Sequence, residues 1–312
     1  MAEPIAVLVP AAWSLAAAAL VAVLACYAAA LDATLTARTA GAAKFPVAAP
    51  LYETVRLLRQ RRRVTVAADT LLWRIGGAGL LAVALLMVTV VPLGRWTLLD
   101  LDVGVVWFNA MDVMVWALVW LAGWGPNSVH SLIGGYRFLA HGLGYELPLM
   151  FALVAPTIAA QSLHVGSISA AQHNLWFVVW MPVAFVVYCV GVAGFSVWGP
   201  LRPALGVDIA GGVADELSGV DRLLFGAGRY ALLAAGAAFA VPMFLGGGAG
   251  PVLPDWLWTI LKTAGLLTVL VWIKQRLPVL RPEKFMEIGW MVLLPAVLVQ
   301  DLVVAVVAVW RG

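Results

Sequence analysis

The sequence is poor in charge and in cysteine. Only 11% of its 312 residues are charged, against roughly 25% in a soluble globular protein, and 63% are hydrophobic. Cys26 and Cys189 both lie in apolar segments, which argues against a disulfide framework and against a cysteine-rich zinc or iron–sulfur site. The basic residues are interleaved with apolar segments rather than gathered in a basic domain, so we expect no nucleic-acid partner. Water is therefore not the main solvent of this chain.

Long apolar runs fill the sequence instead. A helix needs about 20 predominantly apolar residues to cross a bilayer, and such runs recur with no polar block long enough for a separate soluble domain. We predict an all-α, polytopic membrane protein, with residues 1–312 forming a single membrane domain. The eight expected spans, bounded by charge or by Gly and Pro, are 5–30, 71–93, 105–124, 138–162, 174–195, 223–246, 256–273 and 287–310. The first run is too long for the core of a signal peptide, and no Lys or Arg precedes Arg38, so we interpret it as a membrane helix.

The basic residues indicate how the chain is oriented in the membrane. They concentrate in alternate connections between the spans: Arg38, Lys44, Arg56, Arg59, Arg61, Arg62, Arg63, Arg202, Lys274, Arg276, Arg281 and Lys284, with Arg137 at a boundary. The other connections carry only Arg95 and Arg311. By the positive-inside rule, we expect a multi-pass protein of the cell inner or plasma membrane with both termini on the non-cytoplasmic side.

A basic segment follows the first span. In residues 50–63, PLYETVRLLRQRRR, the apolar residues Leu51, Val55 and Leu58 share one helical face and the charges occupy the other. This pattern predicts a short amphipathic helix on the membrane surface. The alternative interpretation is a solvated basic run that only fixes the topology.

Ionisable residues inside the spans are the first candidates for function, because they are expensive to place in hydrocarbon. The candidates are Asp112, Glu146, Arg229, Lys262, Glu287 and Asp301. Glu287 is also explained by a position at the membrane interface, and Asp301 by a pair with an Arg or a neighbouring subunit. A proton pathway requires such carboxylates and lysines in a chain, each receiving and releasing a proton.

Motifs of soluble enzymes are absent from the sequence. There is no Walker loop, no G-x-G-x-x-G after a strand, no H-E-x-x-H and no G-x-S-x-G. The four histidines show no metal spacing. We expect no metal site and no cofactor bound by this chain, so that electrons for any redox chemistry come from a partner.

Three motifs carry a resemblance to a known family. Residues 123–128 (GWGPNS), 132–137 (LIGGYR) and 144–148 (GYELP) resemble, at the same spacing, the G-W-x-S-N-S … L-L-G-x-x-R … S-Y-E motif of the H-type subunit of proton-pumping NADH-quinone oxidoreductase, which is subunit 1 of complex I. Residues 272–295, from WIKQRLP through GW to LP, are similar to the family's run into its last helix. Residues 243–247, MFLGG, are similar to its F-L-G-G turn.

The resemblance implies a subunit that is inactive alone. Within a multi-subunit complex it would help to form the quinone chamber and to couple quinone reduction to proton translocation, with iron–sulfur clusters and flavin in partner subunits and quinone as the substrate. We expect the proton pathway to include Glu146, Tyr145, Arg137, Lys262, Asp208 and Glu216. We expect the quinone chamber to include Asp208, Glu216, Ser218, Gly219, Tyr52 and Arg56.

The family's acidic loop is much reduced here. Between the fifth and sixth spans only Asp208, Glu216, Ser218 and Gly219 keep the character of their matched positions. Three alternatives follow: the equivalent subunit of a membrane-bound hydrogenase or formate hydrogenlyase, a structural paralogue without redox coupling, and a solute transporter. Residues 44–63 and 202–221 are the predicted docking surface for peripheral subunits.

Overall fold

The structure is a computed structural model and describes residues 7–41 and 46–311. Within these residues, eight helical stretches are long and apolar enough to cross a membrane, which confirms the predicted fold class. They are α1 (Ser14–Thr39) with the turn η1 before it, α3 (Thr70–Val88), α4 (Gly104–Trp124), α5 (Val129–Ala160), the run Pro182–Leu201 that contains α8 (Pro182–Phe195) and η2, α9 (Gly219–Phe244), α10 (Asp255–Lys274), and the continuous run of α11 (Pro282–Ile288), the π-helix η4 (Gly289–Leu293) and α12 (Leu294–Arg311). The shorter elements are β1 (Val7–Leu8), η1 (Ala11–Trp13), α2 (Ala49–Arg59), β2 (Trp96–Thr97), α6 (Val165–Ala170), α7 (Phe177–Trp180), η2 (Gly199–Leu201) and η3 (Pro203–Leu205).

The first span is displaced from its predicted position. We expected residues 5–30, of which 5 and 6 lie outside the described residues, whereas α1 occupies Ser14–Thr39. Val7–Leu8 instead pairs with Trp96–Thr97 as a two-residue parallel sheet. The helix continues past Ala30 because the charge of Asp32 is neutralised within the bundle: Lys274 Nζ lies 2.6 Å from Asp32 Oδ1.

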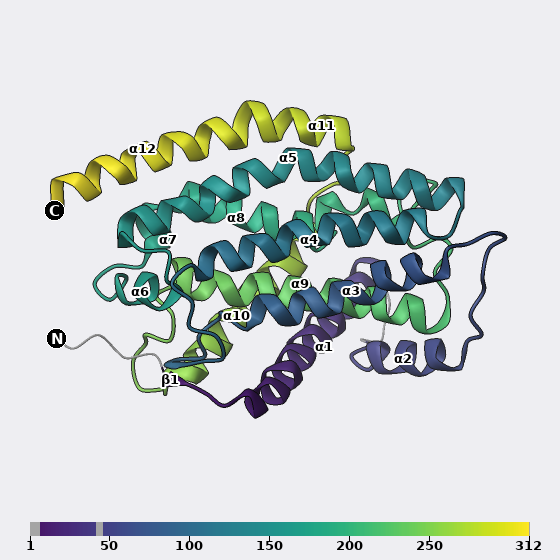
Figure 1. The fold of residues 1–312 in the computed structure, drawn as a ribbon, viewed down its shortest axis with the longest axis horizontal. Coiled ribbons are helices and arrows are strands. Elements are labelled where there is room, and N and C mark those ends of the chain that lie inside the picture. Colours follow the sequence, from purple (N-terminus) through teal and green to yellow (C-terminus); the bar gives the residue numbers. More distant parts are fainter. Residues whose placement is uncertain (1–6, 42–45, 312) are drawn as a thin grey trace.

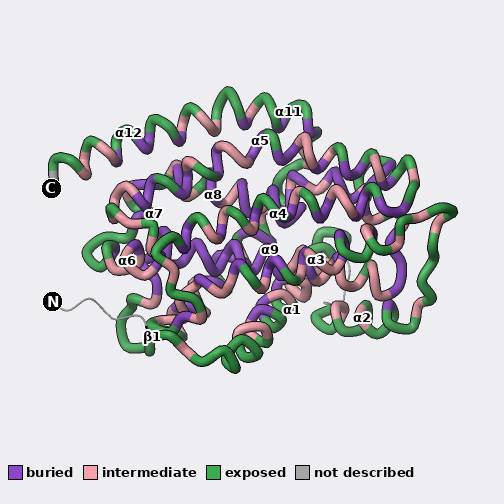
Figure 2. Tube along the Cα trace, in the orientation of Figure 1, coloured by how far each residue is buried: buried purple, intermediate pink, exposed green. Residues whose placement is uncertain are grey.

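The helices form an elongated bundle around α9 (Figure 1). α9 packs against α1, α3, α8 and α10, and its second half is a continuous buried stretch rich in alanine. Small residues let backbones approach closely, which is how helices associate in a membrane. Figure 2 shows the buried residues concentrated along this central helix, while α12 lies at the periphery against α5 and α8.

The bundle has two distinct ends. The basic end comprises α2, the turn at 125–128, the loop at 196–218 and the turn at 275–281, and the opposite end comprises residues 89–103, 161–181 and 245–254. α12 ends at the opposite end, where β1 also lies (Figure 1). The described basic connections thus lie together at one end, and the side of the membrane that this end faces stays a prediction.

The surface helix is present but shorter than predicted. α2 ends at Arg59, and Gln60 is extended, so the helix does not reach residue 63. The chain instead crosses to the start of α9, where Arg63 N donates to Ser218 Oγ (2.8 Å) and Gly219 N donates to Gln60 Oε1 (3.2 Å). These bonds satisfy backbone groups in an extended segment, and they bind the basic run to the loop before α9. Lys44 of the predicted docking surface lies outside the described residues.

Candidate functional site

A polar stripe runs along α5 from the basic end toward the middle of the bundle. Arg137, His141 and Tyr145 are spaced four residues apart and so follow one another along the helix, with Glu146 next to Tyr145. At 1.5 Å per residue, Glu146 lies about 26 Å from the start of α5 and about 21 Å from its end. The stripe thus connects the basic end with a carboxyl group at mid-span.

Arg137 forms the outer end of this stripe. Its guanidinium donates to three successive backbone carbonyls: Ile209 O (3.4 Å), Ala210 O (3.0 Å) and Gly211 O (2.5 Å). It therefore fixes the loop that follows Asp208 to α5. The contact is to backbone carbonyls, and it holds the loop in place.

Two carboxyl groups adjoin at mid-span. Asp112 of α4 is fully buried, and its carboxyl adjoins that of Glu146. None of the four carboxyl oxygens accepts a hydrogen bond of normal geometry from the described residues, and the donor that adjoins the Glu146 carboxyl is the Trp116 side chain. Two adjoining charges with so little compensation would be very unfavourable there. The arrangement is satisfied when a proton lies between the two groups, because the protonated carboxyl then donates to the other.

Aromatic rings and close backbone contacts enclose this carboxyl pair. The Trp116 and Tyr145 rings meet edge to face, with centroids 6.3 Å apart. On the other side of α5, a Cβ on Gly289 would lie 2.2 Å from Gly144 O, so the π-helical segment can approach only because residue 289 is glycine. The pair is therefore sealed from lipid by α4 and by the start of the last span.

Asp112 is a candidate from the sequence, but the sequence does not place it in the site. The only local signal is its position inside a span, with Trp116 one turn further along the same face of α4. The contact with Glu146 on the next helix gives Asp112 its importance. Asp301 of α12 is also buried with both carboxyl oxygens unpartnered among the described residues.

At the basic end, three predicted chamber residues come together near the start of α9. Glu216 accepts a hydrogen bond from Ser128 Oγ (2.8 Å), in the turn between α4 and α5. Ser218 and Gly219 bind the extended segment after α2. The loop before α9, the α4–α5 turn and the basic segment thus meet.

Asp208 lies in the same loop but has a different partner. Arg202 Nε and Nη2 donate to its two carboxyl oxygens at 2.7 and 2.9 Å. The hydrogen bonds from the Arg202 guanidinium lower the pKa of Asp208 below its ordinary value of 3.8. Asp208 is therefore ionised at neutral pH and closes its own loop.

This ion pair should make the order of the loop depend on pH. Because the folded pKa of Asp208 is lowered, its stabilisation is complete above pH 3.8 and is lost as the pH falls through the folded pKa. Hydrogen-exchange protection over residues 203–215, measured relative to the intrinsic exchange rate at each pH, should fall in that acidic range. Asp208→Asn should exchange faster already at neutral pH and show a smaller change on acidification; identical profiles for the two proteins would contradict the prediction.

Tyr52 and Arg56 of α2 point away from these contacts. Tyr52 is 75% exposed, and Arg56 pairs with Glu53 one turn earlier at 2.5 Å. The structure therefore does not bring these two side chains together with Glu216, Ser218 and Gly219. Their place in a quinone chamber stays a prediction.

Lys262 is separate from the rest of the predicted pathway. Its ammonium donates to Leu245 O (2.7 Å), Gly247 O (2.8 Å) and Ala249 O (2.8 Å), and it lies over the Trp176 ring. All three protons are thus used to bind the end of α9 and the turn after it. α9 has 26 residues and spans about 39 Å, so Lys262 is far from Glu216. The contacts are those of a helix-capping cation.

A second charged cluster joins α1, α9 and α10 near the basic end. Asp32 accepts from Lys274 Nζ at 2.6 and 2.7 Å, from Tyr230 Oη at 3.0 Å and from Gln275 Nε2 at 3.2 Å. Lys274 also lies over the Trp198 ring, 4.7 Å from its centroid. Neighbouring Arg229 donates to Val197 O (2.5 Å). The sequence does not reveal this cluster, because its members are far apart along the chain.

These features define a class of protein: a multi-pass helical membrane protein with carboxyl groups held inside the bundle and a polar, loop-rich basic end. Comparisons with known proteins agree. Residues 8–305 match the NADH dehydrogenase family model. The chain is 33% identical over 270 residues to an H-type subunit of NADH-quinone oxidoreductase, numbered 1, from Geobacter metallireducens, covering 83% of this chain and 82% of the relative. It is 35% identical over 269 residues to the H-type subunit numbered 2 of Cereibacter sphaeroides, covering 83% of each.

The chain belongs to this NADH dehydrogenase family, as a divergent member of its H-type subunit group. The family resemblance seen in the sequence motifs is thereby confirmed. The described residues contain no group of three or more His, Cys, Asp or Glu side chains able to hold a metal ion.

Proposed function

We propose that this chain is the H-type membrane subunit of an NADH-quinone oxidoreductase, where it borders the quinone chamber and takes up protons when quinone is reduced. The observation that carries the proposal is the buried carboxyl pair of Asp112 and Glu146 at mid-span, in which no carboxyl oxygen accepts a hydrogen bond of normal geometry from the described residues. Such a pair can hold one proton and exchange it with its surroundings, as a coupling subunit requires.

The basic end supplies the other half of the proposal. Reduction of a quinone to a quinol takes two electrons and two protons, and the electrons would come from partner subunits that carry flavin and iron–sulfur clusters. The residues near the start of α9, Glu216, Ser218 and Gly219, would border the quinone chamber together with Asp208. The polar stripe of α5 leads from there to Glu146, which would place proton exchange within reach of the chamber.

Lys262 has a different proposed role. Its three carbonyl partners support a structural function at the opposite end of the bundle. We therefore assign the proton pathway to Asp112, Glu146, Tyr145 and the residues of the basic end, and Lys262 to the support of α9.

The proposal is tested in a strain whose copy of this chain is deleted. Membranes of that strain should lose NADH-driven quinone reduction that depends on this complex, and the wild-type chain should restore it. Loss of hydrogen- or formate-linked activity instead would show a hydrogenase-type complex. Unchanged activity of both kinds would exclude a redox role and favour the structural or transport alternatives.

The basic segment should hold a peripheral subunit. Arg61, Arg62 and Arg63 are exposed and lie beside the predicted chamber, and Arg62 pairs with Asp221 at 3.4 Å. Changing all three to Gln should reduce co-purification of peripheral subunits several-fold and make it more sensitive to salt. Arg95→Gln at the opposite end is the control and should leave co-purification unchanged. Equal recovery of peripheral subunits from both variants would contradict this role.

A further inference from the structure

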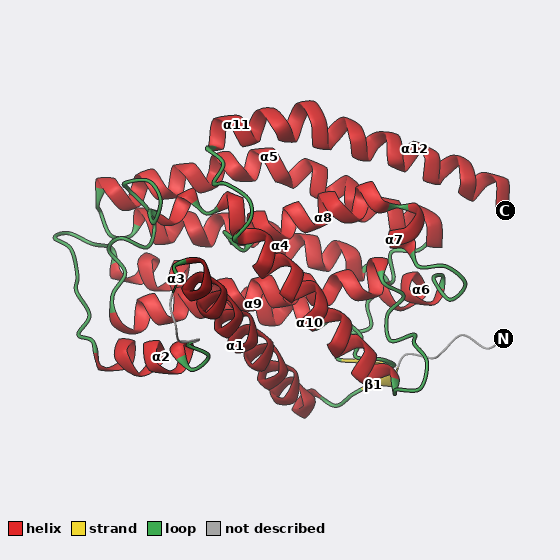
Figure 3. Ribbon diagram, turned by 180° about the vertical axis from the view of Figure 1, so that it is seen from behind, coloured by secondary structure: helices red, strands yellow, loops and turns green. Residues whose placement is uncertain are grey.

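A large apolar cavity lies at the opposite end of the bundle, away from the carboxyl pair and from the basic-end loops. It has a volume of about 500 Å³ and is bounded by α1, α9, α10 and residues 88–98. Its origin is the inclination of α1, which Figure 3 shows crossing the neighbouring helices obliquely. From Val21 onward α1 packs into the bundle through Val21, Leu24 and Ala28, whereas its first turns are mostly exposed and diverge from the bundle.

The walls of the cavity suit hydrocarbon. Ala16 and Ala17 of α1 and Ala234 and Ala238 of α9 line it with small, smooth surfaces, and leucine, isoleucine and valine side chains supply most of the remainder. Transfer of an apolar chain into a cavity with such walls is favourable because it removes apolar surface from water, and the interior of the cavity offers no charge to a polar ligand.

The hydroxyl groups in the wall are already used. Thr97 Oγ1 donates to Leu99 O (3.2 Å), Thr259 Oγ1 to Asp255 O (3.1 Å) and Thr263 Oγ1 to Thr259 O (2.8 Å). The wall therefore has no spare hydroxyl donor for a polar group such as a quinone ring. The occupant that fits is an alkyl chain.

The rim of the cavity has the character of a membrane interface. Trp13, Trp96 and Trp256 line it and are 56%, 37% and 39% exposed, as is typical of tryptophans at the level of lipid headgroups. Next to Trp96 is the exposed Arg95, and Gly94 packs against the exposed Asp255. A cation and an anion at one rim complement a headgroup that carries both a phosphate and an amine.

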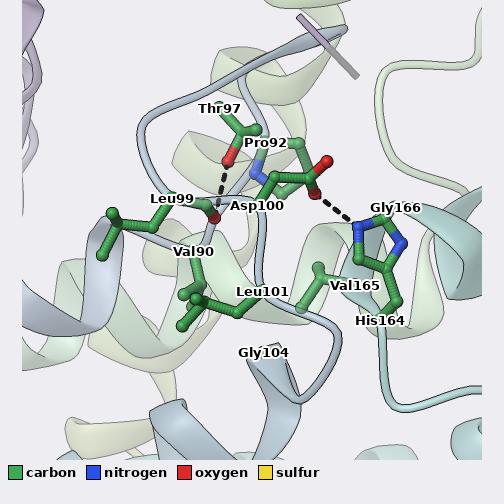
Figure 4. A pocket seen from close by; sticks show the side chains of 10 residues that line it. All are labelled: Val90, Pro92, Thr97, Leu99, Asp100, Leu101, Gly104, His164, Val165 and Gly166. Carbon is green, nitrogen blue, oxygen red and sulfur yellow. Dashed lines mark hydrogen bonds and ion pairs between the residues drawn. The ribbon is translucent and has the colours of Figure 1, made fainter. Parts of the chain in front are cut away.

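The loop that forms one wall is held in place. Figure 4 shows Asp100 in contact with Nε2 of His164, while Nδ1 of that imidazole lies 3.0 Å from Ser167 Oγ. These contacts join the α3–α4 loop to the start of α6. They therefore fix the loop that supplies residues 88–98 of the cavity wall.

We propose that this cavity binds one acyl chain of a phosphatidylethanolamine from the leaflet at the opposite end, with the phosphate at Arg95 and the amine at Asp255. The lipid fills the space that the inclination of α1 creates, and so supports α1 against α9 and α10. This site is independent of the proposed function, because it requires neither quinone nor proton transfer.

The test uses the native complex in vesicles that contain a phosphatidylethanolamine with a diazirine at the middle of one acyl chain. After irradiation and digestion, mass spectrometry should find adducts concentrated on Leu20, Leu24 and Ile260. Ala17→Phe, which fills the cavity, should reduce these adducts at least tenfold. Ala22→Phe is the matched control, since Ala22 is exposed on the same helix and does not line the cavity; it should leave them unchanged.

Four results would overturn the assignment. Adducts spread evenly over the exposed faces of α1 and α12, unaffected by Ala17→Phe, would show bulk lipid only. Protection of the cavity by added long-chain quinone would show a quinone-tail site, and lipid adducts on another subunit's peptide in place of those on Leu20, Leu24 and Ile260 would show a protein interface. Equal labelling by phosphatidylglycerol, with no effect of Asp255→Asn, would refute the amine-bearing headgroup. Co-purification of the other subunits with each variant verifies that the complex is assembled.

Discussion

Glu146→Gln is expected to reduce quinone-linked proton translocation on the order of a hundredfold, a typical contribution of a positioned acid–base group. The substitution keeps the shape of the side chain, and its amide can donate to the buried Asp112 carboxylate. The fold should therefore survive while the exchangeable proton is lost. Asp112→Asn should act in the same direction, because its amide would hold Glu146 permanently ionised. The measurement is NADH-driven acidification in sealed vesicles that contain the assembled complex.

The control for the Glu146→Gln and Asp112→Asn variants is Glu287, which lies near the start of the last span. Glu287 pairs with Lys284 at 2.7 Å, and both side chains are 61% exposed. Glu287→Gln should leave proton translocation unchanged. Full translocation in both the Glu146→Gln and Asp112→Asn proteins would show that the carboxyl pair is a structural feature of the bundle.

Lys274→Met is expected to cause the largest loss of stability, about 3–5 kcal/mol in the free energy of unfolding. Asp32 and Lys274 form a mostly buried pair, with side chains 11% and 16% exposed. Removal of the ammonium leaves the Asp32 carboxylate inside the bundle with no cation in contact and removes the contact with Trp198. Thermal unfolding of the detergent-solubilised complex should show a lower midpoint.

The double variant separates the charge from the packing. Asp32→Asn combined with Lys274→Met removes both charges, so it should recover most of the lost stability. Lys284→Met breaks an exposed pair and should change the midpoint little. If Lys274→Met and Lys284→Met were equally stable, the α1–α10 pair would have no structural importance.

The fold could be predicted from the sequence because the bilayer length and the apolar runs fix the number of spans. The surface helix could be predicted because Leu51, Val55 and Leu58 recur at the spacing of one face of an α-helix. The errors lie where local pattern competes with distant contacts. α1 extends to Thr39 because Asp32 forms an ion pair with Lys274, which is 242 residues away in the sequence. The surface helix ends at Arg59 because the following residues bind Ser218 and Gly219.

The site was predicted only in part, for a related reason. Glu146 stands in a recognisable motif, so its importance is visible in the sequence. Asp112 has no motif, and only the packing of α4 on α5 brings its carboxyl to Glu146. Lys262 was predicted to belong to the proton pathway because it is a lysine inside a span. The carbonyls that bind its ammonium come from the end of α9 and the turn after it, and sequence spacing does not indicate this contact.

The most direct test of the central proposal is purification of this chain from its native membrane in mild detergent, followed by mass spectrometry of the proteins that accompany it. The proposed function predicts recovery of NADH-dehydrogenase-type iron–sulfur subunits together with antiporter-like membrane subunits. Recovery of a nickel–iron subunit, or of the chain alone, would contradict it.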